Sequence, residues 1–184
     1  MTKPEQLSYI IYMKAGPYCG FDLPQIISIK RNEQKNCDKF YWGYGGVFCH
    51  PKRVLPFVDK ALSEGKKVWL LFSITKSNFM SPIGRVEKFS LDKNNWENLP
   101  RDVLLVGNQY ALVAQNLQEA NWDLDLSNYD SMLGDQPGKA LSEYIRYRID
   151  KSCAIYSPKA SLNPKSVKIA YISELVPPYC IYVK

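Results

Sequence analysis

A cysteine next to the only histidine of the chain, Cys49-His50, raises the question of nucleophilic catalysis by a thiol. Such a cysteine needs a base that is close in space, and neighbouring side chains of an extended backbone point apart. A catalytic dyad would therefore need His50 and another cysteine, which the spacings do not bring together. The pattern favours a buried cysteine beside a histidine at a helix start. A cysteine-dependent enzyme that uses Cys49 and His50 is kept as an alternative.

Metal ligands at short spacing are the signature of a zinc site, and the separation of Cys37 from Cys49 matches no such pattern. Four aspartates could suggest calcium, but they lack the glycine and the closing glutamate of a calcium loop, so they favour a solvated acidic loop. These aspartates are Asp123, Asp125, Asp130 and Asp135. The sequence predicts no metal and no cofactor.

Glycines at 43, 45 and 46 resemble a phosphate-binding loop only in composition. They lack the following Gly-Lys-Ser/Thr and do not fit Gly-x-Gly-x-x-Gly, so a dinucleotide or nucleoside triphosphate site is poorly supported. Their conformational freedom instead allows the backbone to turn tightly beside bulky aromatic residues.

The run from Phe40 to Pro51 is dense in aromatic residues, and flat ligands or cations stack on such rings with about 1–3 kcal/mol for each stacked base. Strand alternation would put Phe40 and Trp42 on one face and Tyr41 and Tyr44 elsewhere. The run is therefore either an aromatic platform or a well-packed part of the core. The candidate ligand-binding residues are Tyr41, Trp42, Tyr44, His50, Trp69 and Phe79.

One main helix is predicted at about 51–64. Pro51 suits its first turn, and Gly65 suits the position just after its end. Apolar residues at helical spacing form one stripe, which Pro56 must disturb or precede. These residues are Val54, Phe57, Val58, Ala61 and Leu62.

Most other elements are predicted to be strands. Residues 68–75 form a nearly continuous apolar run, which predicts a central strand covered on both faces. Residues 23–31 are interpreted as a strand, or as a short helix followed by a strand. Further strands are predicted at 7–14, 83–91, 103–106, 110–114, 167–175 and 179–183. We expect a single α+β domain over residues 1–184, with a curved, mostly antiparallel sheet or small barrel capped by the main helix.

Composition sets wide limits on partners and location. The net charge is +6 without a polybasic tract, which permits an anionic partner such as nucleic acid but does not require one. No apolar run approaches the roughly eighteen residues of a membrane span, and the N-terminus has no signal-peptide pattern. Five widely spaced cysteines without Cys-x-x-Cys predict a cytoplasmic protein with reduced thiols.

The run Val-Trp-Leu-Leu-Phe-Ser-Ile-Thr-Lys-Ser-Asn-Phe at 68–79, followed by Gly84-Arg85-Val86, resembles PUA-like domains of the YTH and EVE branches. Those domains follow a helix with a strand of this type, then Phe, Gly and a further strand. The resemblance covers residues 40–86 and departs at 80–83, where the turn is longer. It implies a small barrel that binds a flipped or modified nucleobase, with the aromatic segment near Trp42 as the counterpart of the base-binding cage.

Short motifs also resemble uncharacterised bacterial proteins carried on mobile elements such as integron cassettes, a resemblance that implies no activity. These motifs are Trp42-Gly43-Tyr44-Gly45-Gly46, Cys49-His50-Pro51, Val106-Gly107 and Tyr110-Ala111-Leu112. The sequence therefore favours a non-enzymatic binding module for a flat nucleobase-like or cationic ligand. A further alternative is a protein of a bacterial mobile element that binds or inhibits another protein. The sequence does not determine the oligomeric state.

Overall fold

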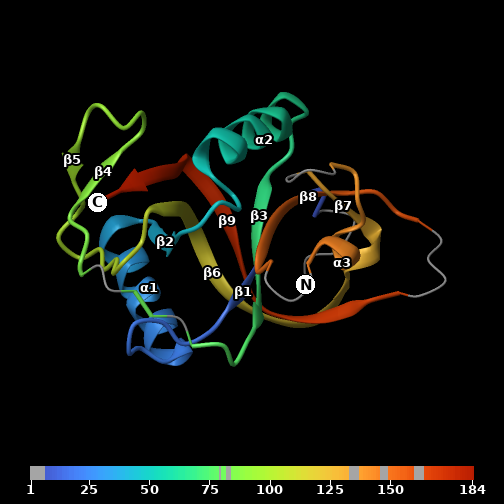
Figure 1. The fold of residues 1–184 in the computed structure, drawn as a ribbon, viewed down its shortest axis with the longest axis horizontal. Helices are drawn as coiled ribbons and strands as arrows, with labels where there is room; N and C mark the ends of the chain where they lie inside the picture. Colours follow the sequence, from blue (N-terminus) through green and yellow to red (C-terminus); the bar gives the residue numbers. More distant parts are fainter. Residues whose placement is uncertain (1–6, 79, 82–83, 133–136, 146–148, 160–163) are drawn as a thin grey trace.

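The computed structural model describes residues 7–78, 80–81, 84–132, 137–145, 149–159 and 164–184. Its centre is a mixed sheet of nine strands, in the order β2-β6-β9-β3-β1-β8-β7, with β4 and β5 attached beside β9 (Figure 1). The strands are β1 (Tyr9–Ala15), β2 (Phe40–Tyr44), β3 (Val68–Ile74), β4 (Lys88–Ser90), β5 (Glu97–Asn98), β6 (Tyr110–Asp125), β7 (Tyr129–Ser131), β8 (Lys151–Tyr156) and β9 (Ser166–Val183). The sheet is strongly curved but not closed into a barrel.

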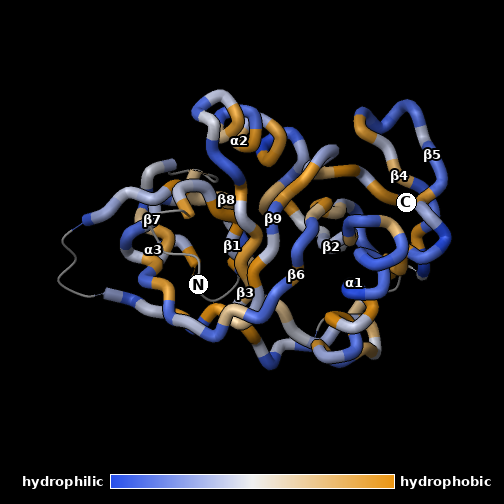
Figure 2. The backbone as a smooth tube through the Cα atoms, turned by 180° about the vertical axis from the view of Figure 1, so that it is seen from behind, coloured by the Kyte–Doolittle hydropathy of each residue, from blue (hydrophilic) through white to orange (hydrophobic). Residues whose placement is uncertain are grey.

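The α+β class is confirmed, and the sheet is mostly antiparallel as predicted. The pair β1 and β3 is parallel, whereas every other strand pair among the described residues is antiparallel. The strand β3 lies between β9 and β1 in the middle of the sheet, as its continuous apolar run predicts. Figure 2 shows hydrophobic residues gathered on β1 and β3 through the centre of the molecule.

The predicted main helix is confirmed as α2 (Pro51–Ser63). His50 is its N-cap and accepts a hydrogen bond at Nδ1 from the backbone N–H of Lys52, 3.2 Å away. Pro56 lies inside the helix on its exposed side and does not end it. Leu62 is 46% exposed, so the buried stripe ends at Ala61.

The prediction for residues 23–31 was wrong, because α1 is a full helix (Leu23–Cys37). Asp22 and Gln25 form a capping box at its start, with hydrogen bonds of 2.8 Å in both directions. Pro24 occupies the first turn, where its missing N–H is no loss. A run of isoleucines resembles a strand locally, but these end signals and the packing of one helical face decide the structure. The described residues thus contain two long helices and the short α3 (Leu141–Tyr144), not one main helix.

The two strands predicted at 167–175 and 179–183 are one strand, β9, because both halves pair with the same long neighbour, β6. The register of that pairing shifts around Pro177 and Pro178. These prolines therefore lie in a β-bulge within one strand and do not form a turn between two strands. Residues 103–106 contribute one isolated bridge instead of a strand, and of residues 83–91 only 88–90 form a strand among those described.

Three apolar clusters fill the fold. The largest joins α1 and α2 to one face of β1 and β3, and a second joins α3 and the 3-10 turn η2 (Leu126–Asn128) to the other face. The third packs Val86, Val103 and Leu105 against the outer side of β2, β6 and β9. No helix among the described residues is long and apolar enough to cross a membrane.

A buried ion pair ties α1 to the rest of the fold. Lys30 Nζ lies 2.6 Å from Glu33 Oε1 and also donates to the carbonyl of Leu104 at 2.9 Å. The Glu33 carboxylate accepts the backbone N–H groups of Tyr41 and Leu104, each at 3.0 Å. Burial lowers the pKa of Lys30, and the neighbouring carboxylate opposes that effect.

We expect Glu33→Gln to destabilise the fold by about 3–5 kcal/mol, because it leaves the buried ammonium of Lys30 without a counter-charge. Equilibrium urea unfolding measures the change. Glu119→Gln is the matched control, since the Arg31–Glu119 pair is exposed and such pairs contribute at most about 1 kcal/mol. Equal destabilisation by the two substitutions would contradict the role of the buried pair.

Candidate functional site

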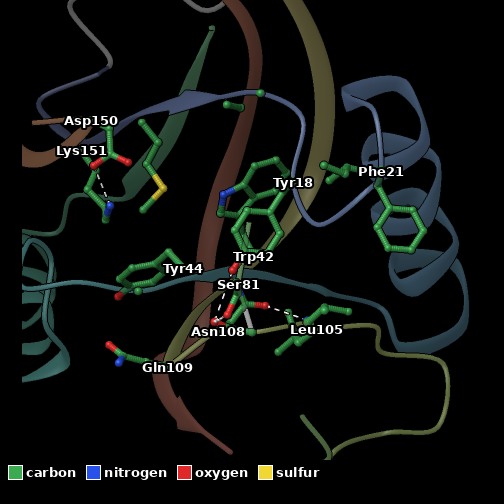
Figure 3. Close-up of a pocket in the computed structure, with 18 of the residues that line it drawn as sticks. Tyr18, Phe21, Trp42, Tyr44, Ser81, Leu105, Asn108, Gln109, Asp150 and Lys151 are labelled. Carbon is green, nitrogen blue, oxygen red and sulfur yellow. Dashed lines mark hydrogen bonds and ion pairs between the residues drawn. The ribbon is translucent and has the colours of Figure 1, made fainter. Parts of the chain in front are cut away.

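A cavity of about 400 Å³ opens where the end of β1, α1, β2, the segment 104–109 and the start of β8 converge. Figure 3 shows Trp42 near its middle, with Asp150 and Lys151 to one side and Phe21 to the other. Three of the glycines that precede α2 line it as well, so part of its wall is bare backbone: Gly43, Gly45 and Gly46. We refer to this cavity as the Trp42 pocket.

Strand alternation brings Trp42 into the pocket. In β2, Phe40 and Tyr44 join the core cluster under the helices and Trp42 packs against it, while Tyr41 joins the cluster on the opposite face. The expectation that Tyr44 lies apart from Phe40 and Trp42 was wrong, because the two-residue alternation continues to the last residue of β2. The Trp42 ring lies 4.2 Å from the ring of Phe72, tilted by 46°, and remains half-buried. One face of the indole is therefore supported by protein, and the residue also borders the open cavity.

Tyr44 forms a wall of the pocket and is held from behind. Its hydroxyl donates to the carbonyl of Cys49 at 2.7 Å and lies 3.1 Å from Sγ of Cys180. Burial raises the pKa of Tyr44 well above its ordinary value, and the thiols of Cys180 and Cys49 add to the shift. The ring therefore remains neutral at physiological pH.

Asn108 and Gly43 meet at the base of the pocket. The Asn108 amide is 94% buried, and its Oδ1 accepts the backbone N–H of Val106 at 3.0 Å. A Cβ on Gly43 would lie 2.3 Å from Cγ and Oδ1 of Asn108, far inside van der Waals contact. Glycine is thus required at position 43 by close approach of a side chain.

The polar end of the pocket is formed by Asp150 and Lys151. Lys151 Nζ lies 2.6 Å from Asp150 Oδ1 and 6.0 Å from the ring centroid of Tyr44, within reach of a cation–π interaction. On the other side, the Tyr18 hydroxyl donates to the carbonyl of Gly107 at 3.3 Å. Burial raises the pKa of Tyr18 to about 12, so this group is neutral too.

Of the six candidate residues, Trp42 and Tyr44 line the pocket. Tyr41 is buried on the opposite face of β2. His50 caps α2 and packs on the rings of Tyr110 and Tyr182, at 5.0 and 5.8 Å, outside the pocket. Trp69 packs in the cluster under α3. Phe79 and Asp135 lie outside the described residues.

The sequence did not indicate Lys151, Asn108 and Tyr18 as lining residues. A weak signal existed for two of them, because Gly107-Asn108 and Gly16-Pro17-Tyr18 are turn sequences, and turns frequently carry binding residues. Lys151 had no such signal, since it is a charged residue at the first position of a strand.

None of the five cysteines lines the Trp42 pocket. Cys49, Cys153 and Cys180 are buried in the core behind Tyr44. Burial raises the pKa of Cys180 to about 12 and that of Cys153 well above its ordinary value. Among the described residues, no group of three or more His, Cys, Asp or Glu side chains is arranged to hold a metal ion.

Comparison with known proteins found no matching family model, no matching curated protein and no matching solved structure. Function is therefore inferred from the geometry of the pocket. The resemblance to PUA-like domains stays a prediction.

Gly43→Ala should destabilise the protein by about 1–3 kcal/mol, because the new methyl group displaces Asn108 from its hydrogen bond to Val106. Gly45→Ala is the matched control, since a Cβ there makes an ordinary contact of 3.7 Å with Gln109. Urea unfolding of both variants gives the comparison. The close approach would be disproved by a Gly43→Ala protein as stable as the control.

Alkylation by iodoacetamide should separate the cysteines into two classes. We expect Cys19 and Cys37, which are partly exposed, to react in the folded protein, while Cys49, Cys153 and Cys180 react only after unfolding. Mass spectrometry of the labelled peptides measures each site. Rapid labelling of Cys49 at neutral pH would contradict this and revive the thiol-enzyme alternative.

Proposed function

We propose that the chain is a non-enzymatic binding module whose Trp42 pocket takes a flat ligand. The single observation that carries this proposal is a half-buried tryptophan, backed by Phe72, at the side of a cavity of about 400 Å³. Small-molecule pockets commonly have volumes of roughly 300–1,000 Å³ and combine apolar walls with a few placed polar groups. A fused-ring compound or a nucleobase fits that volume.

The composition of the walls supports stacking. Phe21, Ile26 and Ile29 supply apolar surface from the side of α1, and Tyr18 and Tyr44 supply neutral aromatic surface. The glycines after Trp42 leave backbone instead of side chains along the opening. A flat ligand beside the indole would exchange water for ring contacts worth about 1–3 kcal/mol per stacked ring.

The arrangement of Cys49 and His50 gives little support to a thiol enzyme with its active site in the pocket. The Cys49 thiol is fully buried behind Tyr44, and His50 uses Nδ1 to cap α2. The pair therefore does not offer a nucleophile and base to a ligand beside Trp42. Five free cysteines suit the reducing, cytoplasmic setting that we include in the proposal.

The test is a screen of flat compounds against the ¹⁵N-labelled protein, with nucleosides, nucleotides, naphthalene derivatives and quaternary ammonium ions. Binding in the pocket should shift the NMR signals of the Trp42 indole and of the Gly43, Gly45 and Gly46 amides. We expect Trp42→Leu to weaken any ligand found by about tenfold or more, because it removes the stacking face.

Trp96→Leu is the control for this substitution. Trp96 lies outside the pocket, where its ring faces the Lys184 ammonium at 4.0 Å. Circular dichroism and thermal unfolding establish that both variants are folded. The proposal fails if no flat compound shifts the pocket signals, or if Trp42→Leu leaves the affinity unchanged.

A further inference from the structure

Charged side chains of the Trp42 pocket are few, and their surroundings differ. Lys30 is committed to Glu33 and to the carbonyl of Leu104. Lys14 follows Met13 in β1, so its side chain leaves the sheet on the face opposite the helices, where it also borders a second hollow. Asp150 and Lys151 remain as the charged pair that borders the cavity.

Lys151 is more deeply buried than an ordinary surface lysine. Its side chain is 9% exposed, while that of Asp150 is 30% exposed. In β8 it lies on the same face as Cys153, which belongs to the core cluster under the helices. The strand therefore directs the ammonium inward to the pocket, and Tyr44 faces it.

The ammonium of Lys151 has hydrogen-bonding capacity left over. An ammonium carries three N–H donors. Within the described part of the chain, its one hydrogen-bond acceptor is Asp150 Oδ1. Because the ammonium is nine-tenths buried and has further N–H donors beyond the one that Asp150 accepts, the arrangement favours a ligand oxygen at this end of the cavity.

Two other polar groups of the pocket are also unused donors. Oδ1 of Asn108 accepts the Val106 N–H, which leaves its amide nitrogen as a donor without a partner among the described residues. The indole N–H of Trp42 likewise has no hydrogen-bond acceptor there. N–H donors from β2, from β8 and from the segment 104–109 thus border the same cavity.

We infer that the ligand of the Trp42 pocket is a flat ring carrying an anionic group, which binds Lys151, with an acceptor atom for Asn108. This inference rests on the proposed function and narrows its ligand class. A cationic ligand fits poorly, because Lys151 already lies over the face of Tyr44 and would repel a second positive charge. The sequence suggested two ligand types, nucleobase-like and cationic. The pocket disfavours the cationic type and favours a nucleobase-like ring with an anionic group and an acceptor atom.

The test uses two probes with the same ring and opposite charge, 2-naphthoate and 2-naphthylmethylamine, in isothermal titration calorimetry. We expect 2-naphthoate to bind the native protein at least about tenfold more tightly than the amine. Lys151→Met should abolish that preference, and Lys151→Arg should retain most of it. Lys66→Met, at an exposed position after α2, is the control for the loss of one positive charge.

A second variant guards against a Lys151→Met protein that fails to fold. Asp150→Asn removes the carboxylate that competes for the ammonium, so it should tighten 2-naphthoate about threefold to tenfold and weaken the amine. Equal binding of the two probes to the native protein, or tighter binding of the amine, overturns the inference. So does unchanged 2-naphthoate affinity in both variants.

Failure of the proposed function gives a different pattern. If no flat compound of any charge shifts the pocket signals, the pocket is not a ligand site and the inference falls with it. If neutral or cationic rings bind beside Trp42 while 2-naphthoate does not, the binding function stands and the anionic ligand class is rejected.

Discussion

The buried contact between Lys30 and Glu33 is the constraint on which the rest of the site depends. A carboxylate without solvent is stable only when hydrogen bonds replace water, and Glu33 obtains them from Lys30 and from the backbone N–H groups of Tyr41 and Leu104. These three partners belong to α1, to β2 and to the segment that precedes β6. The same three parts of the chain form walls of the Trp42 pocket. One charged residue therefore holds in place the helix, the strand and the loop that enclose the cavity.

Two local features shape the pocket: the alternation of side chains along β2 and the lack of a side chain at Gly43. Alternation along β2 separates Trp42 from Tyr41, so one ring borders the cavity while the other completes the core on the far face. At Gly43 no side chain is present, and the amide of Asn108 fills the space. Polar atoms at the base are thus closely packed, but the amide nitrogen of Asn108 has no acceptor within the described part of the chain. This combination of close packing and unused donors supports the proposed binding function of the pocket.

The thiols have a structural part in this arrangement. The thiol of Cys180 and the backbone carbonyl of Cys49 contact the hydroxyl of Tyr44 from behind, and the side chains of Cys49 and Cys153 lie in the same core cluster. Burial raises the pKa values of Cys153, Cys180 and Tyr44, so these three groups stay in their neutral forms. The aromatic wall of the pocket next to Lys151 is therefore uncharged, and the charged side chains that line this end are Lys151, Asp150 and Lys14. These surroundings support the proposed recognition of a negative group.

Local signals in the sequence were sufficient for α2, β1 and β3, and for the placement of Trp42 and Tyr41 on opposite faces of one strand. Those features depend on periodicity and on end residues such as Pro51 and Gly65, which act over one or two turns. The helix α1 was missed because its isoleucines have strand propensity, whereas its capping box and one buried face favour the helix. The predicted strands at 167–175 and 179–183 were not recognised as one strand, β9, because their continuity is visible only in the long pairing with β6.

The composition of the pocket was decided by tertiary structure alone. Lys151 and Asn108 are far from Trp42 in the chain, and ordinary residues by type. They meet because β8 pairs with β1, and β6 with β2. The sequence by itself determined that an aromatic, glycine-rich strand leads into a helix. Only the folded sheet determined which of its rings borders a cavity and which charge lies beside it, because strand partners and their register are set by packing across the whole chain.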